Sequence, residues 1–169
     1  MDFKWIWERF KYLFFRPKAE LEKIQNETGR MGETYLILLI ICILVGLSGI
    51  KKHGWYNLFS EPTIWYVSAL ITTFVTWKLG SQFEVKATWA KSLKINVFAS
   101  VPLLLCITAS NIIGYRLVLL SIGFIYSVYI LYFGIKIIFE PKEREAILYC
   151  LLVVIVGALS NYIARVLIP

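Results

Sequence analysis

Residues 95–139 read INVFASVPLLLCITASNIIGYRLVLLSIGFIYSVYILYFGIKIIF, and this stretch determines the class of the protein. It consists of two long apolar runs that are separated by a short polar break around Asn111, Gly114 and Arg116. A helix rises about 1.5 Å per residue and a bilayer core is about 30 Å thick, so about 20 apolar residues suffice for one crossing. Each run is long enough. The short break between them predicts an antiparallel hairpin of membrane helices.

The composition of the whole chain agrees with a membrane protein. Hydrophobic residues make up 59% of the 169 residues, whereas soluble domains contain about 45–50%. Charged residues make up only 17% and gather between the apolar runs. The sequence therefore predicts an all-α, polytopic integral membrane protein with five transmembrane helices, preceded by an amphipathic N-terminal helix.

Five apolar runs define the predicted domains. The expected spans cover residues 34–50, 63–79, 95–113, 115–139 and 146–168, and they form a transmembrane domain over residues 34–169. Residues 1–33 are expected to form a cytoplasmic or interfacial segment, because their apolar residues alternate with charges and no cleavage site follows them.

The N-terminal segment carries aromatic residues at helical spacing. Phe3, Trp7, Phe10 and Phe14 share one face, which is typical of a helix that lies in the membrane interface with its apolar side towards the lipid. A helix packed on the protein's own cytoplasmic face is the alternative. The predicted contacts with the membrane surface come from this helix and from the basic loop before the third span, and they are Trp7, Phe10, Phe14, Lys86 and Lys91.

The distribution of basic residues predicts the orientation. Fourteen of the 18 Lys and Arg residues fall in the N-terminal segment and in or directly beside the second and fourth loops, which lie on the same side of a five-span protein. Because cytoplasmic segments are enriched in Lys and Arg, the N-terminus is expected in the cytoplasm and the C-terminus outside. The net charge of +7 is assigned to this topology and to anionic lipid, so nucleic acid is not an expected partner.

The sequence shows no catalytic constellation. Its single histidine, His53, lies in an expected exterior loop, and the three cysteines fall inside apolar runs without a metal-binding spacing. No carboxylate is expected at the centre of a span, although proton-coupled transporters usually keep an ionisable group there. We therefore predict a protein that is not an enzyme, with no catalytic residue, no metal and no cofactor.

Uncharged polar residues mark the third to fifth spans. Such groups usually join helices through interhelical hydrogen bonds, and a polar ligand cavity is the alternative. A proline within the third span is expected to bend that helix, which would leave an opening for a lipid or a partner helix. The candidate intramembrane polar and kink site comprises Asn96, Ser100, Pro102, Asn111, Tyr126, Tyr129 and Asn161.

Four short motifs appear in a fixed order along the chain. Pro17, Glu20 and Ile24 precede the first span, and Phe98, Ser100 and Pro102 follow a basic run. The third motif joins Gly114-Tyr115 to residues 121–129, and the last runs from Gly134 through Glu140–Ala146 to Tyr149. In this order and spacing, the chain resembles the Yip1 family of five-span membrane proteins.

The resemblance implies a compact five-helix bundle with a cytoplasmic N-terminus. Eukaryotic members of the family are adaptors for Rab-type GTPases and for vesicle formation between the endoplasmic reticulum and the Golgi. The present chain lacks their long N-terminal region and their Asp-Leu-Tyr-Gly-Pro stretch, and Phe98 stands where many relatives carry Tyr. It is most similar to the short bacterial and archaeal form, which implies a location in a prokaryotic inner membrane.

Two functions are compatible with these features. The first is a non-enzymatic scaffold, adaptor or membrane-organising protein with a trafficking-like role, whose partners are membrane lipids and a membrane or cytoplasmic protein; a homo-oligomer is possible. The second is a small transporter, channel or lipid-translocating protein that uses the polar third to fifth spans.

Overall fold

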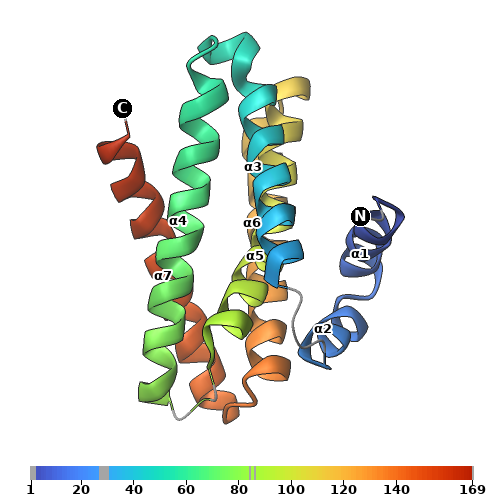
Figure 1. Cartoon of the computed structure of the whole chain (residues 1–169), viewed down its shortest axis with the longest axis vertical. Coiled ribbons are helices and arrows are strands. Elements are labelled where there is room, and N and C mark those ends of the chain that lie inside the picture. Colours follow the sequence, from blue (N-terminus) through green and yellow to red (C-terminus); the bar gives the residue numbers. More distant parts are fainter. Residues whose placement is uncertain (1–2, 27–30, 84, 86, 169) are drawn as a thin grey trace.

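The computed structural model describes residues 3–26, 31–83, 85 and 87–168, apart from the side chains of residues 3–7, 10 and 51–53. In these ranges the secondary structure is entirely helical (Figure 1). The elements are α1 (Phe3–Phe15), α2 (Pro17–Asn26), α3 (Met31–His53), α4 (Asn57–Leu79), the 3₁₀ helix η1 (Gly80–Phe83), α5 (Trp89–Ile113), α6 (Arg116–Ile138) and α7 (Glu143–Leu167).

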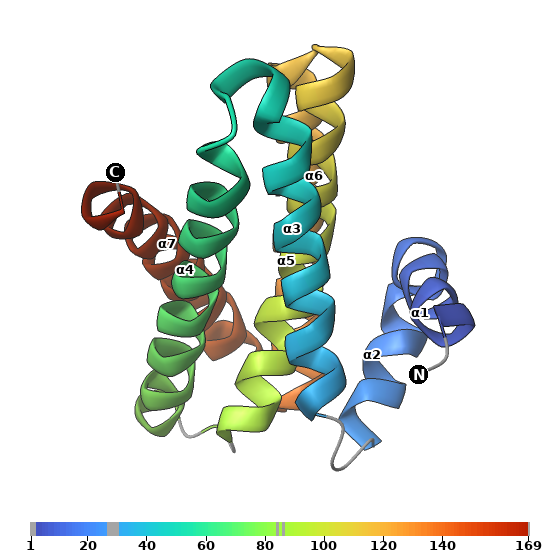
Figure 2. The ribbon, with the colours of Figure 1, turned by 45° about the horizontal axis from the view of Figure 1, so that its top comes forward.

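Helices α3 to α7 run alternately up and down and form an elongated bundle (Figures 1 and 2). We call the end with η1 and residues 139–142 the basal end, and the end with residues 54–56 and 114–115 the distal end. Helix α7 starts beside α6 at the basal end and leans away from it, so that the C-terminus lies on the far side of α4.

Four helices among the described residues are long and apolar enough to cross a membrane. They are α3, counted over Met31–Ile50, and the complete helices α5, α6 and α7. The second predicted span, residues 63–79, lies in α4, which has 23 residues but falls outside this group. Its hydroxyl residues Thr72, Thr73 and Thr76 are buried, and each donates to a carbonyl of its own helix. These three hydroxyl groups of α4 therefore face the inside of the bundle.

The outer surface of the bundle is rich in large aliphatic side chains. Soluble proteins rarely expose such a continuous apolar surface, whereas lipid tails are a favourable environment for it. The exposed residues include Leu39, Ile43, Leu44 and Leu47 on α3, Leu117, Ile122 and Ile125 on α6, and Leu148, Leu151, Ile155, Leu159 and Ile163 on α7. The bundle thus has the surface of an integral membrane protein.

The connection between the first two bundle helices is shorter than the sequence suggests. Residues 51–62 are an expected loop, but α3 continues to His53 and α4 begins at Asn57, so Pro62 lies inside α4. The helices can come this close because Gly46 faces the proline: a Cβ atom at Gly46 would lie 2.6 Å from Pro62 Cγ. Tertiary contact therefore extends both helices beyond their apolar cores.

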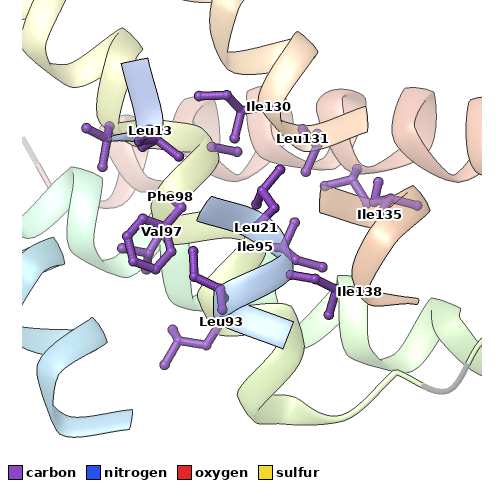
Figure 3. Packing of buried hydrophobic residues seen from close by; sticks show 14 of the residues in the cluster. Leu13, Leu21, Leu93, Ile95, Val97, Phe98, Ile130, Leu131, Ile135 and Ile138 are labelled. Atoms are coloured by element: carbon purple, nitrogen blue, oxygen red, sulfur yellow. The ribbon is translucent and has the colours of Figure 1, made fainter. Parts of the chain in front are cut away.

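Helices α1 and α2 form a hairpin, here called the N-terminal arm, that packs on α6 (Figures 1 and 2). Leu13 and Leu21 of the arm are fully buried and belong to the same hydrophobic core as Ile95 and Ile135. Figure 3 shows Leu21 among the core residues of α5 and α6. These two leucines of the arm are thus covered by the bundle itself.

The pair formed by α5 and α6 makes the most extensive helix contact among the described residues. At Gly123 of α6, a Cβ atom would lie 2.7 Å from Cys106 Cβ and 3.1 Å from Leu103 Cα on α5. Small residues allow this approach, which is the usual basis of helix association in lipid. The predicted hairpin thus forms a tightly packed unit.

We predict that Gly123→Ala destabilises the bundle. The added methyl group has no room, and overpacking of this kind typically costs about 1–3 kcal/mol. The midpoint of thermal unfolding in detergent should therefore fall. Gly157→Ala on α7 is the matched control, because its Cβ would lie at an ordinary 3.8 Å from Thr72. Equal midpoints for the two variants would contradict the close α5–α6 contact.

Candidate functional site

A cavity of about 270 Å³ lies at mid-depth in the bundle. Residues from α3, α4, α5, α6 and α7 line it, and most of the lining side chains are apolar. Three of the predicted site residues, Asn96, Ser100 and Asn161, lie in its wall. Residues that are 65 positions apart in sequence are thereby brought to one site, and this makes the cavity the best candidate for a functional site.

Hydrogen bonds within the protein occupy most polar groups around the cavity. Asn96 is buried, and its side-chain amide donates to Thr76 Oγ1 at 3.1 Å. The hydroxyl groups of Ser100 and Thr72 donate to carbonyls of their own helices, at 2.8 Å each. A polar group without a partner is costly in lipid. Because these groups already have partners within the protein, they offer little hydrogen bonding to a ligand in the cavity.

Pro102 lies beside the cavity, and a side chain of α6 forms a hydrogen bond with the backbone next to it. A proline has no amide hydrogen, so the carbonyl of Phe98 loses its usual helical donor and the helix tends to bend there. Next to this break, the Leu103 amide donates to Ser127 Oγ on α6 at 3.1 Å. The hydroxyl group thus bonds the part of α5 next to Pro102 to α6.

The distal rim of the cavity carries a charged cluster. Arg165 of α7 donates to both carboxylate oxygens of Glu61 on α4, at 2.8 and 3.0 Å. Trp65 Nε1 donates to the same carboxylate at 3.0 Å, and Arg165 Nε donates to Asn161 Oδ1 at 3.0 Å. This cluster, formed by Glu61, Trp65, Asn161 and Arg165, joins α4 to α7 and fixes the amide of Asn161.

The other predicted polar residues lie away from the cavity. Asn111 Nδ2 donates to Ser48 Oγ at 3.0 Å and joins α5 to α3. Tyr126 and Tyr129 stack on each other with ring centroids 5.8 Å apart, and neither residue lines the cavity. Tyr126 contacts the N-terminal arm, and Tyr129 lies next to Tyr126. The set that the sequence groups together therefore divides into a cavity, a helix contact and an arm-binding surface.

The arm-binding surface on α6 consists of aromatic residues. Tyr126 donates to the carbonyls of Phe14 and Leu13 at 2.8 and 3.3 Å, and its ring stacks on Phe14 with centroids 5.7 Å apart. Lys18 lies over the Phe133 ring at 4.4 Å. Tyr126 thereby occupies carbonyls that the last turn of α1 leaves without a helical donor.

A buried ion pair holds the two helices of the arm together. Arg9 of α1 donates to Glu20 of α2 at 2.5 Å, and both side chains are at most 7% exposed. Gln25 also donates to Glu140 in the basal turn at 2.8 Å. The arm is thus tied to the bundle near its base as well as at Tyr126.

The residues that are predicted to contact the membrane surface lie in different surroundings in the structure. Phe14 is 40% exposed beside Tyr126, and Lys91 Nζ donates to the carbonyl of Ile138 near the end of α6 at 3.4 Å. Lys91 thus has a partner within the protein, as expected for a cation near a helix C-terminus. The side chains of Trp7 and Phe10, and all of Lys86, lie outside the described residues.

Sequence reasoning missed the contribution of Glu61, Trp65 and Arg165 to the site. Asn161 and Arg165 are four residues apart, a spacing that brings side chains together on a helix, and this signal could have linked them. Glu61 lies 104 residues away from Arg165 in an expected loop, so no local pattern indicated the ion pair.

The residues around the cavity show which kinds of ligand it could hold. Within the described ranges, no group of three or more His, Cys, Asp or Glu side chains is placed to hold a metal ion. The apolar wall and the few fixed polar groups are typical of pockets that hold small apolar ligands.

Comparison with known proteins identifies one family. A family model with the description Yip1 domain matches residues 11–163, which is nearly the whole chain. Searches of curated proteins and of solved structures found no match.

We predict that the bond between Ser127 and the Leu103 amide stabilises α5 next to Pro102. Ser127→Ala would leave the partly buried Leu103 amide without this acceptor, at a cost of about 1 kcal/mol. Pro102→Ala restores a helical donor to the Phe98 carbonyl, so the serine substitution should cost less in that background. A double-mutant cycle on unfolding midpoints measures this coupling. Equal costs in both backgrounds would show that the serine acts independently of the proline.

Proposed function

The chain belongs to the Yip1 domain family, and from this membership we propose that it is a non-enzymatic membrane scaffold or adaptor. In this role it organises the membrane surface and recruits a membrane or cytoplasmic protein, as the adaptor members of the family do. The observation that carries the proposal is the outer face of the N-terminal arm.

The outer face of the arm combines exposed aromatic and basic side chains. Tyr12 is 41% and Phe15 is 79% exposed, and Lys11 and Arg16 are exposed next to them. Aromatic residues and arginine are enriched in protein interfaces, and they also favour the headgroup layer of a membrane. A surface of this kind at the start of a membrane bundle supports recruitment of a partner close to the bilayer.

The docked arm lies far along α6 from the basal end, and this depth supports the idea that the arm can leave α6. Tyr126 holds the end of α1 twelve residues above the basal end of α6, which is roughly 18 Å along the helix. At that depth in a bilayer, the exposed charges of Lys11 and Arg16 would be costly. We therefore propose that the arm exchanges between α6 and the membrane interface, where the same charges meet headgroups and α1 lies as the predicted amphipathic helix.

The expected topology completes the proposal. With α4 as the fifth span, the basal end carries most of the basic residues and faces the cytoplasm, and the C-terminus lies outside. The proposed location is a prokaryotic inner membrane. The residues that line the cavity come from the middle of their helices, whereas a transport pathway must extend towards both ends, so transport is not the function that we propose.

We predict that a photo-crosslinker at position 15 captures a protein partner in native membranes. Replacement of Phe15 by benzoylphenylalanine should give a discrete adduct, because this side chain points away from the bundle. The same group at Ile155, on the apolar surface of α7, is the matched control and should label lipid only. A chain without residues 1–16 should lose the partner in pull-downs. Unchanged pull-downs after this deletion would contradict the proposal.

We also predict that Tyr126→Phe releases the arm. The substitution removes both hydrogen bonds to α1 but keeps the aromatic ring, so amide hydrogen exchange in α1 should accelerate several-fold. Exchange in α3 to α7 should stay unchanged. Tyr162→Phe, at an exposed position on α7, serves as the control. Unaltered exchange in α1 would show that Tyr126 does not hold the arm.

A further inference from the structure

We propose that the mid-depth cavity binds one membrane glycerolipid. One acyl chain enters the cavity from the side, between α6 and α7, and the ester carbonyl of that chain accepts a hydrogen bond from Asn161 Nδ2. This site is independent of the scaffold role of the arm, which lies on another face of α6.

The position of the cavity gives it access to lipid. Its wall includes Phe124 of α6, which is 48% exposed, and the exposed Ala158 of α7. These two helices are joined at the basal turn and diverge towards the distal end (Figure 2). Both exposed lining residues lie on the apolar surface of the bundle, so the nearest ligands are the acyl chains of the bilayer.

The size and lining of the cavity suit an acyl chain. A dry apolar cavity of about 150 Å³ is enough to bind benzene, and this cavity has about 270 Å³. Its wall includes Leu103, Leu131 and Val153. An empty space of this kind forfeits dispersion contacts with its lining, which a flexible hydrocarbon chain restores.

One buried donor in the wall is without a partner. Among the cavity-lining residues, Asn161 Nδ2 is the buried side-chain polar atom that has no hydrogen-bond partner. Its orientation is fixed chemically, because Arg165 can only donate and the atom that faces Arg165 Nε at 3.0 Å must therefore be Oδ1. The amide group is thus held with its NH₂ free for a ligand that accepts a hydrogen bond.

The depth of Asn161 matches an ester carbonyl. It is the lining residue nearest the C-terminal end of α7, six residues or roughly 9 Å from Leu167. The remaining lining residues of α7, from Val153 to Ala158, lie closer to the centre of the bundle. A lipid of the distal leaflet would therefore place its ester group at Asn161 and its acyl chain in the cavity.

The hydrogen bond is tested by a pair of lipids that differ only in this carbonyl. The full-length protein in detergent is titrated with dioleoylphosphatidylcholine and with its diether analogue, and bound lipid is counted by native mass spectrometry. We expect one saturable site that binds the ester lipid about fivefold more tightly. In Asn161→Asp, which keeps an acceptor for Arg165 but lacks the donor, this preference should disappear. Equal binding of both lipids by the unaltered protein would overturn the role of Asn161.

The cavity is tested by one substitution inside it and one outside it. Gly157→Leu places a branched side chain in the cavity and should weaken saturable lipid binding about tenfold, whereas Ile155→Leu, on the outer surface of α7, should bind as the unaltered protein does. If Gly157→Leu binds lipid as tightly as Ile155→Leu, the lipid belongs to the outer annulus and the proposal is wrong. The comparison of ester and ether lipids needs no variant, so a failure of Gly157→Leu to fold leaves the proposal testable.

Discussion

The rest of the bundle depends on the close contact between α5 and α6. Gly123 brings α6 against Cys106 on α5 so tightly that an added methyl group would collide. A few residues away, Ser127 supplies the acceptor for the amide beside Pro102. The glycine allows the close packing on which helix association in lipid rests, and the serine bond meets the requirement that backbone groups in a membrane find their partners within the protein. This hairpin forms one side of the cavity and also carries the surface that binds the arm.

The need for hydrogen-bond partners within the protein also explains why few polar groups of the cavity remain available to a ligand. Its polar residues are abundant in sequence, yet Asn96, Ser100 and Thr72 donate to neighbouring groups and offer little to a ligand. Asn161 differs because Arg165 occupies its oxygen and leaves its nitrogen free. The proposed lipid would therefore meet one hydrogen-bond donor in an otherwise apolar space, which matches an acyl chain with a single ester carbonyl.

The two faces of α6 separate the two proposed roles. Tyr126 and Phe133 bind the arm, while Phe124, Ser127 and Leu131 line the cavity. Recruitment at the membrane surface and lipid binding within the membrane can thus be altered independently by substitution, although one helix carries both.

The sequence by itself determined the class of the protein, the family resemblance and the helical hairpin of residues 95–139, because apolar runs of this length have few stable alternatives in water. It also singled out Asn96, Ser100, Pro102 and Asn161, since polar groups and a proline are conspicuous in apolar surroundings. Only the tertiary structure decided that three of them share a cavity while Asn111 and Tyr126 do not, because helix rotation and tilt are set by close packing rather than by periodicity. The pairing of Glu61 with Arg165 and the docking of the arm on α6 have the same origin: both join residues about 100 positions apart, and no local pattern encodes such a contact.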